Sequence, residues 1–549
     1  MSDAEGVFPF DAGPLGRIEG LTVHSTKGRP ALRYFGGLPY ALPPTGPYRF
    51  RAPRELPAEY KYGTHANPGR FTGETAVCPQ PPSRVPPNAA LFDENCLQLN
   101  IWVPCSDPGP DGRWPVMIYF HGGFLQWGSA NRSPRSMVPL LSDSAMRTII
   151  VLPSYRLNAL GFLAGKELAE EATKQGEPTG NMGFWDQRLA IEWVHRNIAH
   201  FGGHKDSITV GGYSAGGFSA FYQLAYELYR VPADKAVIKS LFMLSNGCGV
   251  QPKTVSDAQG QFDEFIHRLG IEADLSAEAK LSKLRQLPYQ KLILALGKMK
   301  ISEFRPVSEG KFVSQDLIQS INCGDFARRM RSRNVRLLMG ECRDEHTVYR
   351  NWRTPDDSFS GLYTRLCAEY PAAVVDSLLS QYCGTSKALP SGIRDWQELF
   401  GRIYADMQVH CLERGFLDAL FRGGMVPGKG VLRYRFDRRL GCVDATLPAE
   451  WGVTHSSDVP IWFWGQDLPK GLSDQEISWL KEWNADWAAF IEGKEVEWGT
   501  NTPKTMRRWR SDGSTDVWED DQWERGLEVW RVVNGGPAQS RESRPTTET

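Results

Sequence analysis

Short runs of β-branched, aliphatic and aromatic residues recur along this chain, and stretches with helical patterning separate them. Such runs are typical of strands that are buried on both faces of a sheet. Six strands are predicted in this way: Val116–Phe120, Thr148–Leu152, Ser207–Val210, Val335–Met339, Val431–Phe436 and Ile461–Trp464. Helices are expected between them, most clearly at Asp186–His200 and Gly217–Tyr229. This alternation predicts an α/β fold with a large, mostly parallel central sheet and helices on both faces.

The domain organisation follows from the same pattern. The chain has 549 residues, but no linker or internal repeat divides residues 1–530. We therefore predict a single domain over residues 1–533, with helical insertions around residues 256–327 and 358–423. Residues 534–549 are polar and are expected to form a flexible tail. Trp483 and Trp487 are one helical turn apart, and we expect them to pack a C-terminal helix against the core.

The composition excludes several classes of protein. The 63 Lys and Arg nearly balance the 64 Asp and Glu, which argues against an electrostatic nucleic-acid binder. The hydrophobic share of 41% excludes a disordered chain. No apolar run is long enough to span a membrane. The ten cysteines include neither a C-x-x-C pair nor a cluster at zinc spacing, so neither a metal nor a cofactor is expected. The first residues lack the pattern of a secretion signal, so a cytoplasmic location is expected.

The segment Gly212-Tyr213-Ser214-Ala215-Gly216 matches the pattern G-x-S-x-G. It follows the predicted strand Ser207–Val210 and precedes the predicted helix Gly217–Tyr229, which is the setting of a nucleophile elbow. Small residues on either side let the backbone close into a strained turn that exposes the serine hydroxyl. We therefore predict that Ser214 is a nucleophile. The alternative is a glycine-rich turn with an incidental serine.

A second glycine turn, His121-Gly122-Gly123-Phe124, follows the predicted strand Val116–Phe120. A turn of this type supplies backbone donors to an oxyanion when it stands beside a nucleophile elbow. The predicted donors are the N–H groups of Gly123 and Phe124, together with that of Ala215. His121 is expected to hold the loop through hydrogen bonds of its ring. The alternative is a plain glycine turn.

A serine nucleophile needs a base and an acid that orients the base. In this arrangement the chain order is serine, acid, histidine, so the base is expected late in the sequence. His267 and His410 lie in apparent helices, whereas His455 lies in a loop before the predicted strand Ile461–Trp464. His455 is therefore the predicted base.

Two carboxylates, Asp344 and Glu345, follow the predicted strand Val335–Met339 and occupy the loop where the acid belongs. We predict Glu345 as the acid and keep Asp344 as the alternative. His346 is the competing base, but it adjoins the acid and is poorly placed to accept its hydrogen bond.

Several motifs together resemble the type-B carboxylesterase family, which includes cholinesterases and fungal lipases of the α/β-hydrolase fold. The resemblance covers about residues 15–533. The motifs that carry it are Leu38–Pro44, Tyr48–Phe50, Glu94–Asn100, Gly180–Arg188, Asn197–Ile198, Phe201–Gly203 and Gly211–Gly217. Intracellular fungal members offer the best analogy for this chain.

The resemblance implies that Ser214, Glu345 and His455 form a catalytic triad and that Ser245 forms hydrogen bonds near it. It also implies buried ion pairs Arg49–Glu94 and Arg156–Asp186. Cys78 and Cys96 match the first disulfide of the family, and both a bonded and a reduced pair remain open.

Three positions depart from the pattern of the family. Tyr213 stands where many members have Glu, and Phe124 stands where many have a third Gly. His346 replaces the usual Gly after the acid. The bulk of Phe124 is expected to narrow the site against hindered alcohols.

These observations predict a serine hydrolase that cleaves a small, largely apolar carboxylic ester, such as a secondary metabolite or xenobiotic, through an acyl-enzyme. An apolar pocket is expected from residues of both helical insertions together with Phe124, Leu125, Trp127, Tyr213 and Phe218. The expected partner is the small-molecule ester alone, and the protein is expected to be a monomer or homodimer. The alternatives are an acyltransferase or lactone-forming enzyme with the same triad and a non-catalytic interaction module on the same fold.

Overall fold

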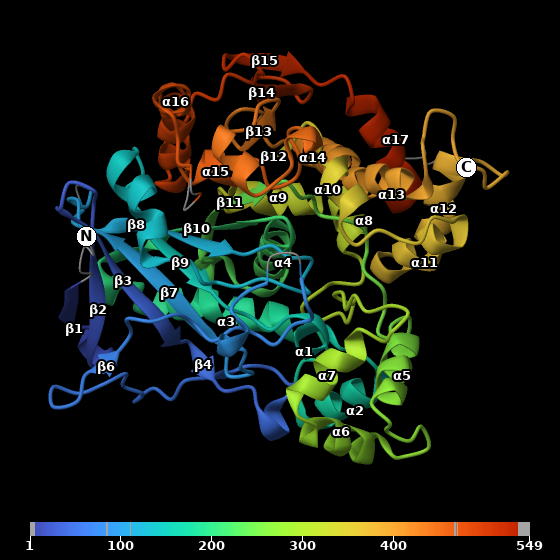
Figure 1. Cartoon of the computed structure of the whole chain (residues 1–549), viewed down its shortest axis with the longest axis horizontal. Helices are drawn as coiled ribbons and strands as arrows, with labels where there is room; N and C mark the ends of the chain where they lie inside the picture. Colours follow the sequence, from blue (N-terminus) through green and yellow to red (C-terminus); the bar gives the residue numbers. More distant parts are fainter. Residues whose placement is uncertain (1–5, 84–85, 110, 466–467, 469, 536–549) are drawn as a thin grey trace, which may run out of the picture.

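A large twisted sheet runs through the centre of the molecule (Figure 1). The computed structural model describes residues 6–83, 86–109, 111–465, 468 and 470–535. Within them, one sheet of 13 strands has the spatial order β1 (Gly6–Asp11), β2 (Arg17–His24), β3 (Pro30–Pro39), β7 (Gln98–Pro104), β9 (Ile149–Pro153), β8 (Trp114–Phe120), β10 (Gly203–Tyr213), β11 (Ile238–Leu244), β12 (Arg336–Cys342), β13 (Val431–Phe436), β14 (Thr505–Trp509) and β15 (Thr515–Glu519), with β6 (Gly69–Arg70) beside β2. A separate pair joins β4 (Ala41–Leu42) to β5 (Arg54–Glu55).

The centre of the sheet is parallel and its margins are antiparallel. Every neighbouring pair from β9 to β14 is parallel. The pairs from β1 to β9 and the last pair, β14 with β15, are antiparallel. The carboxyl ends of the parallel strands therefore meet at one edge, which is where ligands bind in such sheets.

The described α-helices connect or cover these strands. They are α1 (Asn158–Phe162), α2 (Lys166–Gln175), α3 (Met182–Asn197), α4 (Ala215–Arg230), α5 (Gln259–Arg268), α6 (Ala277–Gln286), α7 (Tyr289–Leu296), α8 (Leu317–Asn322), α9 (Asp325–Ser332), α10 (His346–Asn351), α11 (Phe359–Glu369), α12 (Ala372–Cys383), α13 (Trp396–Ala405), α14 (Cys411–Arg422), α15 (Val459–Trp462), α16 (Asp474–Ile491) and α17 (Trp523–Asn534).

Alternate residues of each central strand enter two different cores, because successive side chains of a strand point to opposite faces. In β8, Val116, Ile118 and Phe120 join the core that contains α3, α4, α14 and α17. Met117 and Tyr119 join the core that contains α15 and α16. Helices thus cover both faces of the sheet, and the predicted α/β architecture is confirmed.

Most of the predicted elements are present. The predicted strands up to Val431–Phe436 correspond to β8, β9, β10, β12 and β13, and the two predicted helices correspond to α3 and α4. Trp483 and Trp487 are buried where α16 packs on the sheet, as expected.

The predicted strand Ile461–Trp464 is wrong, because its first two residues end the short helix α15 and its last two form a turn. Pro460 begins its first turn, and the N–H groups of Ile461 and Trp462 donate to the carbonyl of Asp458 at 3.0 and 3.1 Å. The Trp462 ring packs in an aromatic cluster instead of between strands. A run of four apolar residues is too short for its periodicity to separate a buried turn from a strand.

The two expected insertions are rich in helix, although residues 297–316 form neither helix nor strand. Figure 1 shows α5, α6 and α7 grouped beside α2, and α11, α12 and α13 grouped near α17. Residues 536–549 of the expected tail lie outside the described residues. Asn534 itself ends α17, and its carbonyl accepts a hydrogen bond from the Asn322 amide at 2.9 Å. Residue 534, the first of the expected tail, therefore belongs to α17.

Both ion pairs implied by the resemblance are present. Arg49 Nε lies 2.6 Å from Glu94, and Arg156 Nη2 lies 2.7 Å from Asp186. Cys78 and Cys96 are both buried free thiols in the structure. The hydrogen bond with Cys78, together with burial, raises the pKa of the Cys96 thiol.

A cluster of buried charges ties β12, α14 and the segment after β15 together. Arg414 is almost fully buried and donates to Glu341 and to Asp520, each at 2.8 Å. Glu413 is also buried, but neither of its carboxylate oxygens has a hydrogen-bond partner among the described residues. Burial, with the nearby charge of Glu341, raises the pKa of Glu413 to about 8. A group of this kind makes folding stability depend on pH.

We predict that Glu413→Gln flattens the pH dependence of stability. The unfolded carboxyl titrates at about 4.3, so the folded protein holds the extra proton between roughly pH 4 and 8. The free energy of unfolding therefore falls as pH rises through this window, by about 1.4 kcal/mol for each pH unit. Melting temperatures at pH 5.5 and 8.5 measure the effect. The melting temperature of the variant, compared with that of the parent protein, should increase mainly at pH 8.5. Equal slopes in both proteins would contradict the assignment.

Candidate active site

Ser214 lies in a strained turn between β10 and α4. Its φ and ψ are 54° and −127°, which a residue with a side chain rarely adopts. The glycines on both sides have no room for a side chain. A Cβ on Gly216 would lie 1.9 Å from the Phe120 carbonyl oxygen, and one on Gly212 would lie 2.5 Å from the same atom. The end of β8 is thus pressed against the start of α4, and this contact fixes the turn that holds Ser214.

The structure brings Ser214, His455 and Glu345 together from three distant parts of the sequence. His455 Nε2 lies 2.9 Å from Ser214 Oγ, and His455 Nδ1 lies 2.6 Å from Glu345 Oε2. All three residues are buried, and Ser214 is only 6% exposed. Because Nδ1–H donates a hydrogen bond to Glu345, the lone pair of Nε2 faces the serine hydroxyl.

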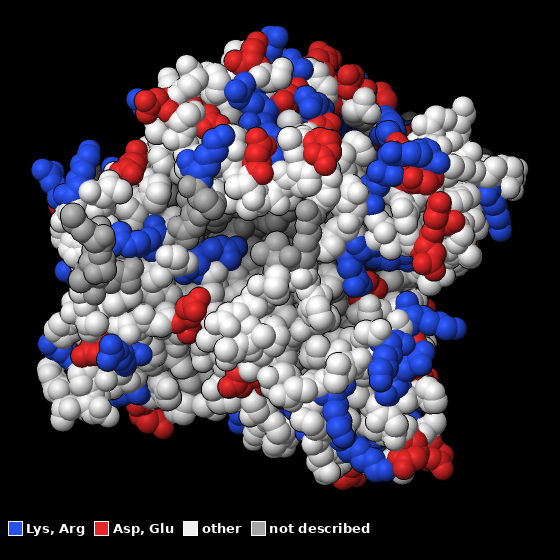
Figure 2. Space-filling model, viewed as in Figure 1, with Lys and Arg blue, Asp and Glu red and all other residues white. Residues whose placement is uncertain are grey.

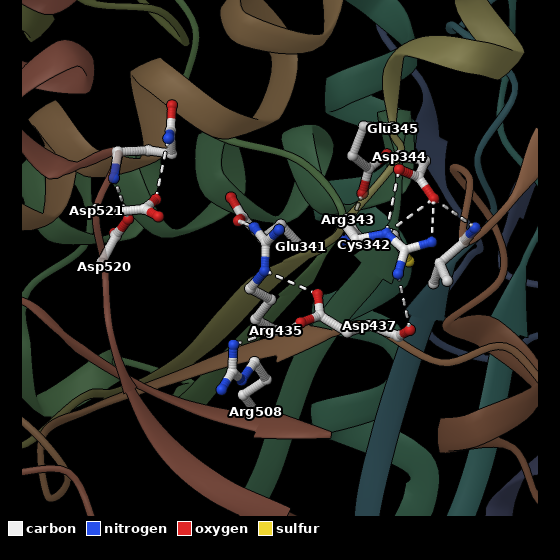
Figure 3. Close-up of polar contacts among 12 residues, drawn as sticks. Glu341, Cys342, Arg343, Asp344, Glu345, Arg435, Asp437, Arg508, Asp520 and Asp521 are labelled. Carbon is white, nitrogen blue, oxygen red and sulfur yellow. Dashed lines mark hydrogen bonds and ion pairs between the residues drawn. The ribbon is translucent and has the colours of Figure 1, made fainter. Parts of the chain in front are cut away.

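The two candidate acids have different surroundings (Figure 3). Glu345 faces His455, and its Oε1 accepts a hydrogen bond from the Cys342 N–H at 2.8 Å. Asp344 instead accepts from the Val453 N–H at 2.9 Å and pairs with Arg343. Of the two carboxylates, Glu345 is therefore the one that reaches the imidazole.

The competing histidines make other contacts. His346 begins α10 and lines a separate cavity, and burial lowers its pKa. His410 Nδ1 lies 2.7 Å from Glu341, and His267 is exposed on α5. Among the described residues, the imidazole within hydrogen-bond distance of Ser214 is that of His455.

Ser245 lies in a polar network beside the three residues. Its hydroxyl donates to Asp458 Oδ2 at 2.8 Å, and the Tyr434 hydroxyl donates to the same oxygen at 2.8 Å. Burial, with the nearby Glu345 carboxylate, raises the pKa of Asp458 to about 6. The sequence did not reveal Asp458 as part of the site, although its position three residues after His455 is a signal that could have suggested it.

The loop after β8 lies directly against Ser214. A Cβ on Gly122 would lie 3.0 Å from Ser214 Cβ, and one on Gly123 would lie 2.2 Å from the Trp127 carbonyl oxygen. Gly123 and Phe124 both have positive φ, at 116° and 57°. Within the described part of the chain, their N–H groups make no hydrogen bond. Ala215 is the first residue of α4, so its N–H has no partner inside the helix.

His121 holds this loop from behind. Its Nδ1–H donates to the Gly122 carbonyl at 2.8 Å, and its ring stacks on Tyr155 with centroids 4.5 Å apart. The Tyr155 hydroxyl donates to the His121 carbonyl at 2.8 Å. Burial lowers the pKa of His121 to about 4, so the ring is neutral at pH 7. These contacts agree with the supporting role expected from the sequence.

Two tyrosines contact the imidazole of His455. The ring centroids of Tyr213 and Tyr349 lie 4.8 and 5.0 Å from that of His455. The Tyr349 hydroxyl lies 3.1 and 3.2 Å from the two ring nitrogens. Sequence reasoning missed Tyr349, although it follows Glu345 by one helical turn at the start of α10.

The comparisons with known proteins identify the family of this chain. The chain matches the Carboxylesterase family over residues 12–520. The chain belongs to this family. A carboxylic ester hydrolase of Gibberella moniliformis is 55% identical to this carboxylesterase over 96% of both chains. An uncharacterized esterase/lipase of Schizosaccharomyces pombe is 37% identical over 95% of this chain and 96% of its own length.

The crystal structure of Aspergillus niger EstA has the same fold. It superposes with a TM-score of 0.72 at 20% identity and covers 97% of this chain and 100% of its own chain. The carboxylesterase has the α/β-hydrolase fold that the sequence predicts.

A cavity of about 490 Å³ opens beside the loop after β8 in this carboxylesterase. The space-filling view shows a hollow near the middle of the molecule, with charged side chains of both signs around it (Figure 2). Of the predicted pocket residues, Trp127 and Tyr213 line the cavity. The rest of its described wall comes from residues 74–91, 119–132 and 443–468 together with Trp352.

Phe124, Leu125 and Phe218 are not among the described residues that line this cavity. Phe124 packs edge-to-face on Trp352 at 5.3 Å, and Leu125 is fully buried in the core. Phe218 packs on Tyr222, with ring centroids 4.8 Å apart.

No residue of the two helical insertions is among the described residues that line the cavity. Of their helices, α6 packs on α2, α12 on α17 and α13 on α10. The cavity wall is also mixed rather than apolar, since Glu74 and Arg132 are part of it.

Metal-binding clusters and membrane-spanning helices are both absent from the described residues. No group of three or more His, Cys, Asp or Glu side chains in this part of the chain is arranged to hold a metal ion. None of the described helices is both long enough and apolar enough to cross a membrane.

We predict that Glu345→Gln and Asp344→Asn affect ester cleavage very differently. The first removes the carboxylate on His455 and favours the wrong tautomer, a change that costs on the order of 10⁴ in kcat in a related triad. The second removes a carboxylate that only positions the backbone near residue 453, so a loss below about tenfold is expected. Initial rates with p-nitrophenyl acetate measure both. A larger loss of kcat in Asp344→Asn than in Glu345→Gln would reverse the assignment of the acid.

Proposed function

We propose that this protein is a serine hydrolase that cleaves small carboxylic esters through an acyl-enzyme. The observation that carries the proposal is the chain of contacts from Glu345 through His455 to Ser214, at 2.6 and 2.9 Å. Membership of the carboxylesterase family and the name of the 55% identical relative support the same chemistry.

In the first half of the reaction, Ser214 Oγ attacks the acyl carbon of the ester while His455 Nε2 takes the hydroxyl proton. The negative charge that develops on the carbonyl oxygen is stabilised by the N–H groups of Gly123, Phe124 and Ala215. His455 then gives its proton to the leaving alcohol, and the acyl group stays on Ser214 as an ester.

In the second half, a water molecule takes the place of the alcohol. His455 removes a proton from the water, and the water oxygen attacks the acyl carbon. His455 then returns this proton to Ser214 Oγ as the bond between Oγ and the acyl carbon breaks, which releases the carboxylic acid and restores the serine. Glu345 keeps its hydrogen bond with His455 Nδ1 and stabilises the imidazolium that forms in each half. The buried position of Glu345 and His455 keeps bulk water from weakening this interaction.

The single experiment that tests the function is covalent labelling of Ser214. A fluorophosphonate should label the parent protein, and Ser214→Ala should abolish the label and lower kcat on the order of 10⁶-fold. Ser219→Ala is the matched control, because it removes another buried hydroxyl of α4 that contacts the Ala215 carbonyl and Gln187. This control should keep the label. Full activity in Ser214→Ala would refute the proposal, and it would favour a non-catalytic role for the motif.

Product analysis separates hydrolysis from acyl transfer. We expect sustained turnover of a p-nitrophenyl ester in the absence of any added alcohol, with one carboxylic acid formed for each p-nitrophenol. An acyltransferase or lactone-forming enzyme would stop after one burst of p-nitrophenol, because its acyl-enzyme needs an alcohol acceptor. Such a burst without turnover would overturn hydrolysis and leave the nucleophile assignment intact.

A further inference from the structure

One basic side chain lines the cavity beside the catalytic loop. Arg132 is the only Lys or Arg among its described lining residues. The guanidinium donates to the carbonyl of its neighbour Asn131 at 2.8 Å, and it forms no ion pair within the described part of the chain. Arginine has five N–H donors, so most of the hydrogen-bonding capacity of Arg132 is unused.

The second large cavity of the protein provides a contrast. It is lined by Arg343, Arg402, Arg435, Arg508 and Arg525, and each of these arginines is paired with a carboxylate. Figure 3 shows three of them, with Asp344 and Asp437 among the carboxylates that hold them. Those guanidinium groups are therefore already satisfied, whereas no carboxylate among the described residues pairs with Arg132.

Tyr119 offers a second unused donor at the same cavity. Its ring is buried on β8, and its hydroxyl makes no hydrogen bond within the described residues. Burial raises the pKa of this hydroxyl, and the positive charge of Arg132 acts in the opposite direction. The phenol therefore stays protonated at neutral pH and remains a donor, close enough to Arg132 to respond to its charge.

We propose that Arg132 and Tyr119 bind a carboxylate group carried by the ester substrate. The inference rests on the proposed function, and it narrows the substrate from esters in general to esters with an anionic group. Guanidinium and carboxylate groups match in geometry, and the bond between them is charge-assisted. The cavity also contacts Gly122, Gly123 and Tyr213, so a substrate bound there reaches the catalytic loop.

Glu74 is the carboxylate among the described residues that line the same cavity. Its negative charge allows a test of whether the charge in the cavity determines the preference for anionic esters. Its side chain is exposed and no ion pair joins it to Arg132. An anionic ester gains from Arg132 and is repelled by Glu74. Removing Glu74 should therefore have the opposite effect to removing Arg132.

The experiment compares matched esters in the full chain. One pair differs in the acyl part: p-nitrophenyl hemiglutarate against p-nitrophenyl valerate. The other pair differs in the alcohol part: 4-acetoxybenzoate against 4-methylphenyl acetate. The quantity measured is the ratio of kcat/KM for the anionic ester to that for its neutral partner.

We expect Arg132→Gln to lower this ratio about 10- to 100-fold in at least one pair, as the loss of a charged hydrogen bond predicts. Arg132→Lys should recover part of the lost ratio, and Glu74→Gln should raise the ratio above that of the parent protein. Arg113→Gln, which changes an exposed arginine outside the cavity, should leave it unchanged. Tyr119→Phe should lower it to a smaller extent than Arg132→Gln.

An unchanged ratio in Arg132→Gln for both pairs would overturn the inference. If the ratio fell equally in Arg113→Gln and Arg132→Gln, the inference would also be overturned, because the fall would reflect the net charge of the protein and not a contact in the cavity. Failure of the proposed function looks different: the parent protein would then cleave neither ester of a pair, and fluorophosphonate would not label Ser214.

Discussion

The backbone of α4 begins against the end of β8 at a separation that leaves no space for a side chain. Gly212 and Gly216 make this contact possible, and the Phe120 carbonyl is the atom that any Cβ would strike. The same contact brings the loop after β8 beside Ser214 and places the first N–H of α4 nearby. One steric constraint therefore positions the nucleophile and the candidate oxyanion donors together. The other parts of the site are arranged around it.

The buried carboxylates show how the fold separates groups with similar chemistry. Asp344 and Glu345 are neighbours in sequence, yet one pairs with Arg343 and the other faces His455. Asp458 is close to both Glu345 and His455, but it is occupied by the hydroxyls of Ser245 and Tyr434. Each carboxylate has its own donors. The imidazole consequently has one acidic partner, and its orientation is defined.

The elements with strong local signals were predictable from the sequence. The glycines around Ser214, the turn after β8 and the strands β8, β9, β10, β12 and β13 follow from steric and periodic rules that act over a few residues, whereas the parallel strands β11 and β14 were missed. The antiparallel strands β1, β2 and β3 were not predicted, because their identity depends on pairing with one another. The segment Ile461–Trp464 was misassigned for a related reason: burial alone does not separate a helical turn from a strand.

The candidate site shows the same difference between residues with a strong local sequence signal and residues without one. Ser214, His455 and Glu345 are recognisable from their motifs and order, whereas Tyr349 and Asp458 carry only a weak signal, their spacing from Glu345 and His455, and were identified from the folded chain. The cavity was the least predictable part. Phe124, Leu125 and Phe218 are near Ser214 or its neighbouring loop in the motifs, but the backbone turns their side chains into the core. The wall of the cavity comes from segments that are far apart in the sequence, and no local sequence pattern connects them.

The cavity wall belongs mostly to connecting segments rather than to the parallel strands or to α4. Loops tolerate sequence change better than the elements they join. The catalytic residues, by contrast, depend on close backbone contacts that admit few substitutions. This division lets related chains diverge in what they recognise while the reacting groups stay fixed. Under the proposed function, selectivity is therefore open to evolution, and to engineering, at cavity positions that do not endanger folding.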